Sequence, residues 1–196
     1  GVKAYNDYLI VQGRTFSSAV LGDIWDTDPT VDNTAVKNLN RLGGAVNQEV
    51  MWECYGAGVS DVMLFPTAAG LTYLDLGVQD QSVRSALLSQ EVQNIFDGAR
   101  NPENMAALYN NSLYILAMNY YADTEAPVNY NNIIMIYDLS RKKWYPPLTY
   151  GVNCFCATDK MVLAGDSASG IIYQMFTGNS DNGEDIHAVA LLAPLN

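Results

Sequence analysis

The residues that could carry chemistry are few: three cysteines, one histidine and several groups of acidic side chains. Cys154 and Cys156 are separated by one residue in a β-prone run, so they are predicted to lie on the same face of a strand as free, buried thiols. A structural zinc site needs four ligands, which a single C-x-C pair and one histidine do not supply. We therefore expect no metal centre at this pair.

The only histidine, His187, follows Glu184 and Asp185. A catalytic triad would also need an activated nucleophile, and the chain contains no G-x-S-x-G elbow. His187 is accordingly predicted to be a satisfied or exposed residue on a strand. The sequence provides no catalytic, cofactor-binding or metal-binding residue, and the chain is expected not to be an enzyme.

Acidic residues near the C-terminus vaguely resemble a calcium loop: Asn179, Asp181, Gly183 and Asp185. Their spacing departs from D-x-[DN]-x-[DN]-G, and the terminal Glu of that motif is missing. A polar β-turn is the favoured interpretation, because Asn, Asp and Gly are turn residues. The same ambiguity applies to a second acidic set, Asp26, Asp28 and Asp32. A glycosidase needs two carboxylates at a fixed separation, and with 21 acidic residues no pair can be selected from the sequence.

The overall charge narrows the classes of partner. The chain has 196 residues, of which 21 are acidic and 10 basic, and its formal net charge is −11. Such a surface repels phosphate backbones and anionic membranes, so tight nucleic-acid binding is not expected. The acidity favours solubility or a passage to which polyanions do not adhere. The sequence contains neither a long apolar run nor a signal peptide, and no membrane insertion is expected.

The elements that would position these residues are short β-prone runs separated by turn residues. Two pairs are predicted to form hairpins: residues 8–11 with 18–21, and 61–65 with 71–76. Residues 106–109 and 112–118 flank the Asn110-Asn111 turn, and Asn tolerates the positive φ that tight hairpins require. Residues 132–139 form a near-continuous apolar run, which is typical of a strand buried on both faces. Further strands are expected over 48–55, 152–157, 161–164, 170–176 and 186–192.

Two segments differ from this pattern. Residues 31–44 are polar and are predicted to be an excursion over the surface. Residues 82–96 are the only helical candidate, because their apolar residues are roughly spaced for one helix face, and a short helix and a turn are both compatible with them.

One hairpin pattern occurs twice. Residues 64–73 and 163–173 each combine an apolar strand, a turn of small residues and Gly-x-x-Tyr, which begins at Gly70 and at Gly170. Glycine permits the backbone geometry of the turn, and Tyr73 or Tyr173 would fill the space between stacked sheets. Repetition favours a propeller over a sandwich.

A second signal is Tyr137-Asp138, followed by a basic turn and Trp144. This order resembles the hairpin of a kelch-type blade, in which the tryptophan packs between blades. The alternative is an ordinary hairpin with a half-buried tryptophan. The prolines at 146 and 147 place the end of this hairpin at a sheet edge.

Taken in order, these motifs resemble the propeller-bearing tail proteins of bacteriophages, including the hub, nozzle and stabilisation proteins of short-tailed phages. The resemblance covers nearly the whole chain and is carried by the segments 8–13, 20–29, 61–73, 137–144, 165–173 and 181–186. It implies a structural ring around the DNA exit path, without catalytic residues.

The sequence therefore predicts an all-β fold of short antiparallel strands in blade-like sheets, a partial or subunit-completed propeller, with a β-sandwich as the alternative. It is expected to be one domain, 1–196, with about three blades over 1–77, 105–150 and 151–196. Three blades cannot close a ring. The chain would then be part of a longer polypeptide, which a first residue other than Met also favours, an array completed by neighbouring subunits, or a different β architecture.

The expected function is that of a virion tail component without cofactors, made in the host cytoplasm. Its partners would be copies of itself and other tail proteins, and DNA would pass without tight binding. The alternative is a carbohydrate-binding or glycan-processing propeller, since 13 Tyr and 3 Trp could provide sugar-stacking surfaces if they are exposed.

Overall fold

The computed structural model describes residues 2–5, 8–13, 15–21, 35–40, 44–56, 59–76, 83–122, 126–178, 180–181 and 184–185. These residues form an all-β structure in which every strand pairing is antiparallel, with one short α-helix. No described helix is long and apolar enough to cross a membrane.

The first sheet has the strand order β1-β2-β3-β4. Its strands are β1 (Val2–Tyr5), β2 (Tyr8–Gln12), β3 (Ser17–Leu21) and β4 (Ala35–Asn40). The predicted hairpin of 8–11 with 18–21 is confirmed as β2 and β3, in which Leu9 pairs with Val20. Residues 35–40 were expected in a surface excursion, and that expectation is wrong for them because they pair with β3 as an edge strand.

The second sheet has the order β5-β6-β7-β8. It consists of β5 (Trp52–Gly56), β6 (Val59–Thr67), β7 (Gly70–Leu76) and β8 (Val83–Leu87). The predicted β6–β7 hairpin is confirmed, and Gly70 has a φ of 128°, which only glycine adopts readily. The helical candidate 82–96 divides into β8, a 3-10 turn (Gln90–Val92) and α1 (Gln93–Asp97), which continues one residue beyond the candidate.

The third sheet has the order β10-β11-β12-β13, and β9 (Ala99–Arg100) also pairs with β11. A 3-10 turn (Pro102–Asn104) leads into β10 (Ala106–Asn110), followed by β11 (Leu113–Tyr120), β12 (Ile133–Asp138) and β13 (Lys143–Trp144). The β10–β11 turn has positive φ at Asn111 and Ser112, one residue beyond the predicted Asn pair. All six residues of β12 are buried, as the apolar run predicts.

The fourth sheet has the order β14-β15-β16, and it is followed by a separate two-stranded hairpin, β17-β18. The strands are β14 (Val152–Ala157), β15 (Val162–Asp166), β16 (Ile172–Met175), β17 (Ser180–Asp181) and β18 (Glu184–Asp185). Expected strand residues 186–192 lie outside the described residues.

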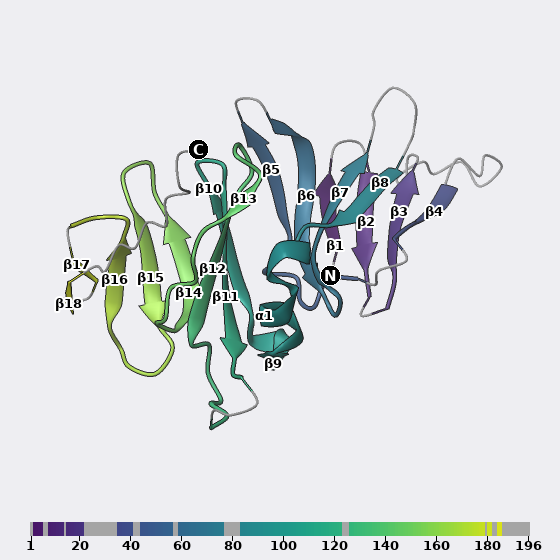
Figure 1. Cartoon of the computed structure of the whole chain (residues 1–196). Coiled ribbons are helices and arrows are strands. Elements are labelled where there is room, and N and C mark those ends of the chain that lie inside the picture. The colour runs from purple at the N-terminus through teal and green to yellow at the C-terminus, as the bar shows by residue number, and fades with distance from the viewer. Residues whose placement is uncertain are drawn as a thin grey trace, which may run out of the picture.

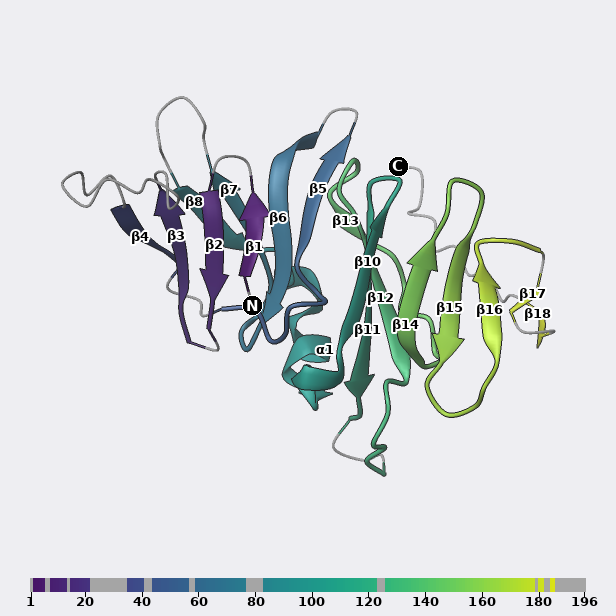
Figure 2. The same ribbon diagram turned by 180° about the vertical axis from the view of Figure 1, so that it is seen from behind.

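The four larger sheets stand side by side in chain order, from β1–β4 at one end to β14–β16 at the other (Figures 1 and 2). Residues 1–77 hold strands of the first two sheets, residues 105–150 hold most of the third, and the fourth lies within 151–196. Strand spacing alone does not reveal this division, because β1 and β4 carry weak strand signals.

Three apolar clusters lie between neighbouring sheets. Ile10 and Ala19 of the first sheet pack with Met63 and Phe65 of the second. The largest cluster joins the second and third sheets and contains Leu64, Tyr114 and Leu116, among others. A third cluster joins the third and fourth sheets, with Ile115, Ile134 and Ala164 among its members. Alternation along each strand therefore gives the two middle sheets two covered faces each.

Candidate functional site

The sequence-predicted acidic sites are not brought together by the described structure. His187, Asn179 and Gly183 lie outside the described residues, as do Asp26, Asp28 and Asp32. Asp181 and Glu184 are partners in the strand register of the β17–β18 hairpin. Within the described ranges, no group of three or more His, Cys, Asp or Glu side chains could hold a metal ion.

Cys154 and Cys156 are alternate residues of β14, and both thiols are free. The expectation that they are buried is wrong, because both are exposed, whereas Cys54 is buried. Cys154 pairs with Gly165 and Cys156 with Leu163, on the side of β15 opposite Ala164. That side faces away from the third sheet, since Ala164 belongs to the cluster between the third and fourth sheets. The thiols are therefore exposed because no described residue of a following sheet covers them.

The first strands of three sheets come together. β10 lies against β5 on one side and β14 on the other, although each of these strands is about 50 residues from the next along the chain. Two cavities lie beside these strands, with volumes of about 580 Å³ and about 350 Å³. They share Glu49 and Asn153 as lining residues, and we call them together the first-strand groove.

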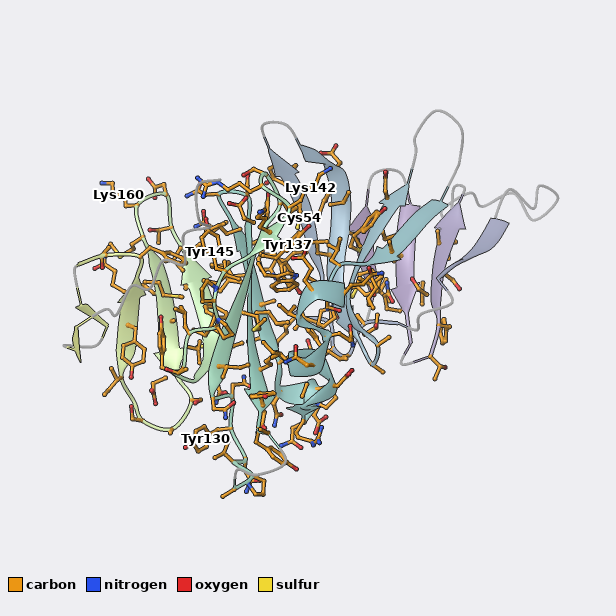
Figure 3. All side chains as sticks on the ribbon, in the orientation of Figure 1. Cys54, Tyr130, Tyr137, Lys142, Tyr145 and Lys160 are labelled. Carbon is orange, nitrogen blue, oxygen red and sulfur yellow. The ribbon has the colours of Figure 1, made fainter. Side chains whose placement is uncertain are left out.

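The larger cavity is bounded mainly by the strands themselves, and its lining residues are Gln48, Glu49, Met51, Trp52, Ala106, Ala107, Asn153, Cys154 and Phe155. The smaller cavity is more polar, with Glu49, Glu103, Asn104, Met105, Asn129, Tyr130 and Asn153. Tyr130 lies at the end of the third sheet opposite Lys142 (Figure 3). The smaller cavity therefore opens toward the Tyr130 end of the molecule.

Asn153 reaches both cavities because of a local irregularity in β14. The pairing register between β14 and β15 shifts between Val152 and Cys154, which leaves Asn153 without a partner in the ladder. Bulges of this kind turn a side chain away from the sheet's regular alternation. The Asn153 amide still donates to the Ser167 carbonyl at 3.4 Å.

Glu49 is held by the turn before β5. The Asn47 side-chain oxygen accepts hydrogen bonds from the Glu49 and Val50 amides, at 2.9 and 3.2 Å. The Asn47 amide nitrogen donates to the Met105 carbonyl at 2.9 Å, which ties the turn to the start of β10. In addition, the Trp52 indole donates to the Ala107 carbonyl at 3.0 Å. These contacts fix the walls of the first-strand groove.

Asn131 is a buried polar residue that joins the third and fourth sheets. The Asn131 amide nitrogen donates to the carbonyls of Asn104 and Val152, at 2.8 and 2.9 Å. The Ser167 hydroxyl donates to the Asn131 carbonyl at 2.6 Å. Gly151 lies so close that a Cβ there would come within 1.8 Å of the Asn131 carbonyl oxygen.

The side chains that line the groove can both donate and accept hydrogen bonds. Among its described lining residues are two carboxylates, Glu49 and Glu103, and several amides, with no Lys or Arg. Carboxylates accept hydrogen bonds, and amides both donate and accept them. Such a lining favours hydroxyl or ammonium groups and repels phosphate.

The tryptophan of the β12–β13 hairpin lies between two sheets. Trp144 pairs with Tyr137, and the two rings are 5.0 Å apart between centroids. The Trp144 ring also meets Phe96 edge-on at 5.8 Å. Tyr137 and Cys54 both lie in the layer between the second and third sheets (Figure 3). The prediction that this tryptophan packs between sheets is confirmed, as is the edge position of β13.

Two hairpins share an aspartate turn. Asp138 Oδ1 accepts from the Ser140 hydroxyl at 2.6 Å and the Arg141 amide at 3.0 Å, and Tyr145 donates to Oδ2 at 3.3 Å. The Ser140 hydrogen bond contributes most to holding the Asp138 pKa below its ordinary value, and the Arg141 amide adds to it. Arg141 also forms an ion pair with this carboxylate at 3.7 Å.

Asp166 repeats this arrangement in the fourth sheet. Its Oδ1 accepts from the Ala168 and Ser169 amides, and Tyr173 donates to Oδ2 at 2.9 Å. The two backbone amides lower the Asp166 pKa to about 2, with Tyr173 contributing less. In both hairpins the aspartate accepts hydrogen bonds from residues of the turn, and a tyrosine seven residues later donates to the same carboxylate. These carboxylates therefore stabilise turns.

Sequence reasoning missed the groove residues Glu49, Glu103 and Asn153. In the sequence, Glu49 is marked only by the polar turn before β5 and Glu103 only by the polar residues before β10. Asn153 is marked only as a polar residue in the otherwise apolar strand β14. No protein-family model matches the chain, and no curated protein matches it. The site therefore rests on geometry alone.

Proposed function

We propose that this chain is a structural component of a bacteriophage tail, contributing propeller-like blades to a ring of the hub or nozzle type around the path of the exiting DNA. The observation that carries the proposal is the stacking of four consecutive antiparallel sheets, with apolar clusters between neighbours and adjacent first strands β5, β10 and β14. A propeller consists of such sheets around an axis. The proposed partners are copies of the chain and other tail proteins.

The charge of the first-strand groove supports a passage that DNA does not adhere to. Glu49 and Glu103 lie at the first strands, where a ring would have its lumen. The chain as a whole carries a formal charge of −11. A lumen with this charge would repel the phosphate backbone and allow it to slide.

The test of this proposal is the position of the chain in assembled particles. Antibodies against the recombinant chain are applied to tailed phage particles that encode it, and bound gold label is located by electron microscopy. Label at the tail supports the proposal, and particles whose tails remain unlabelled after partial disassembly contradict it. A duplex DNA titration at physiological salt should show no saturable binding below about 100 μM, weaker than or at the limit of ordinary non-specific binding.

A second candidate function is glycan binding in the smaller cavity. The observation that favours it is Tyr130, whose side chain is 42% exposed, beside the Asn129 and Asn104 amides and the Glu103 carboxylate. Sugars are bound by aromatic rings that stack on them and by polar groups that pair with their hydroxyls.

A glycan array separates the two candidates. Binding that is abolished by Tyr130→Ala and retained in Tyr145→Ala, a second partly exposed tyrosine at the other end of the sheet, would favour the glycan-binding candidate. Absence of binding to every glycan class, together with tail labelling, would favour the structural one. Tyr130 and Tyr145 have similar exposures, 42% and 39%, which makes them a matched pair.

A further inference from the structure

Cys154 and Cys156 are exposed free thiols on one side of β14. They are alternate residues of the strand, so their side chains point to the same face of the sheet. Gly165 is the cross-strand partner of Cys154, and a Cβ added to it would lie 2.7 Å from the Cys154 sulfur. Cysteine is ordinarily among the most buried residues. Two exposed thiols on one face therefore indicate a chemical role and not a packing role.

Met161 brings a third sulfur atom to this face. The Thr158 amide donates to the Met161 carbonyl at 2.9 Å, so the pairing of the two strands continues as far as this residue. Met161 is 37% exposed, whereas its neighbour Val162 is buried in the cluster between the third and fourth sheets. Leu163 is opposite Cys156, which makes Met161 the diagonal neighbour of Cys156. Diagonal neighbours are about 7–8 Å apart, a distance that a long side chain spans.

The spacing of the two cysteines fits a bridging metal ion better than a disulfide. Alternate residues of a strand have Cα atoms about 6.6 Å apart, because each residue rises by about 3.3 Å. A disulfide ordinarily requires about 5.5–6 Å and tolerates at most about 6.8 Å. Two sulfurs that share a metal ion need only lie within about 4.6 Å of each other, with metal–sulfur bonds of about 2.3 Å as in zinc thiolates. Rotation of the two side chains between staggered rotamers meets this requirement without bending the strand.

The sulfur ligands also select the metal. Thiolates and thioethers are soft ligands, which favour monovalent copper. A structural zinc site needs four ligands, and within the described part of the chain no third His, Cys, Asp or Glu side chain joins the pair. The expectation that the pair holds no metal rests on this ligand count for zinc. It does not extend to copper(I), whose filled d shell accepts two or three sulfur ligands.

We propose that Cys154, Cys156 and Met161 bind one copper(I) ion on the open side of the fourth sheet. The two cysteines bind as thiolates, and each releases its proton to solvent when it binds the metal. The uncharged Met161 thioether is the third and weaker ligand. This site does not depend on the proposed tail function.

The first test is the transfer of copper(I) from its coloured bicinchoninate complex to the full chain, in ascorbate and without oxygen. The expected result is one copper(I) ion per chain, with a new ultraviolet absorption from thiolate-to-copper charge transfer. Cys154→Ala and Cys156→Ala should each lower the affinity about 100-fold or more, because a chelating pair becomes a single ligand. A chain that withdraws no copper from the chelator would overturn the proposal.

The third cysteine and a second methionine provide matched controls. Cys54 is buried, so Cys54→Ala should leave the copper affinity unchanged. Met161→Leu should lower the affinity, by less than the loss of either cysteine. Met175→Leu, at a buried methionine of the same sheet, should not lower it. Copper retained by a chain that lacks both Cys154 and Cys156 would overturn the site, and equal affinities of the two methionine variants would overturn the third ligand. Circular dichroism verifies that each variant is folded.

Alkylation by iodoacetamide, measured by mass spectrometry, separates copper binding from other roles of the pair. In the metal-free chain both exposed thiols should react, and one equivalent of copper(I) should protect both. Unreactive thiols in the metal-free chain would show that this face is covered, and would overturn the proposal. Equal protection by one equivalent of zinc would overturn the choice of copper(I). Rapid formation of an intramolecular disulfide with diamide, seen as the loss of two hydrogen atoms, would identify a redox pair instead. None of these measurements uses tail particles, so failure here is separable from failure of the proposed function.

Discussion

The indole of Trp144 donates a hydrogen bond to the carbonyl of Leu88, 56 residues earlier in the chain, at 3.0 Å. Trp144 lies in the edge strand of the third sheet, and Leu88 directly follows the last strand of the second. The ring fills the space between the sheets, and its nitrogen satisfies a carbonyl that has left the ladder. Trp144 therefore links the second and third sheets both by the packing of its ring and by a hydrogen bond.

Replacing Trp144 separates these two contributions. Trp144→Phe keeps an aromatic ring and loses the hydrogen bond to Leu88, so the free energy of unfolding should fall by about 1 kcal/mol. Trp144→Ala also removes the ring contacts with Phe96 and Tyr137, and the loss should be about 3 kcal/mol, the low end for an aromatic residue because this one is only partly buried. Urea denaturation followed by circular dichroism measures both. Equal losses for the two variants would show that ring packing contributes nothing.

Tyr114 provides a test at alkaline pH. It is fully buried, and its hydroxyl donates to the Val50 carbonyl at 2.6 Å. Burial raises the Tyr114 pKa well above its ordinary value. A group with a raised folded-state pKa stabilises the fold below its unfolded pKa, about 10 for tyrosine, and this contribution is lost as the pH rises above that value.

We therefore expect Tyr114→Phe to lower the free energy of unfolding by about 1–2 kcal/mol at neutral pH, because Val50 loses its partner. The variant should lose less stability than the original chain as the pH rises above about 10. Denaturation midpoints across this range measure the difference. Parallel curves for the two proteins would mean that Tyr114 ionises in the folded state without consequence.

Asp166 should affect the stability of the fold at acidic pH. Its pKa of about 2 lies below that of an unfolded aspartate, so its stabilising contribution is present above about pH 4 and is lost as the pH falls toward 2. Asp166→Asn should lower the thermal midpoint at pH 7 and flatten its decrease between about pH 4 and 2. Tyr173→Phe removes one of the hydrogen bonds and should give a smaller change in the same direction. Thermal denaturation of the three proteins at several pH values decides this, and an unchanged acid slope in Asp166→Asn would refute it.

Two glycines test the junction of the third and fourth sheets. Gly151→Ala would place a Cβ 1.8 Å from the Asn131 carbonyl oxygen, which is far closer than atoms can approach, so the loop must move. We expect a loss of about 2 kcal/mol or more, in the range of overpacked sites. Gly170→Ala is the control, since no atom lies within 4 Å of its Cβ position, and reduced freedom of the unfolded chain should make it neutral or slightly stabilising. Similar losses from both would show that close packing at Gly151 is not the cause.

Local sequence patterns predicted the elements whose signals are self-contained. The β6–β7 and β12–β13 hairpins follow from apolar, β-prone runs that flank short turns. β4 was missed because Ala35–Asn40 is half polar, and the edge strand forms by pairing with β3. The exposure of Cys154 was mispredicted because its strand looks like a core strand, while burial depends on whether another sheet follows.

The first-strand groove could not be predicted from the sequence, for a different reason. It depends on the approach of Glu49, Glu103 and Asn153, which are more than 100 residues apart at the extremes. The Asn153 bulge arises from a register shift between two strands, which no residue in β14 alone specifies. Contacts such as Tyr114 with Val50 are likewise set by how sheets stack.

The strand order within each sheet has a consequence for synthesis. Apart from β9, every described pairing of named strands joins neighbours in the chain, so each sheet can form from a continuous stretch of polypeptide as it leaves the ribosome. The contacts between sheets can form only when the next stretch has been translated. A nascent chain therefore has one open apolar face at each stage, and that face advances by one sheet every time a sheet is completed.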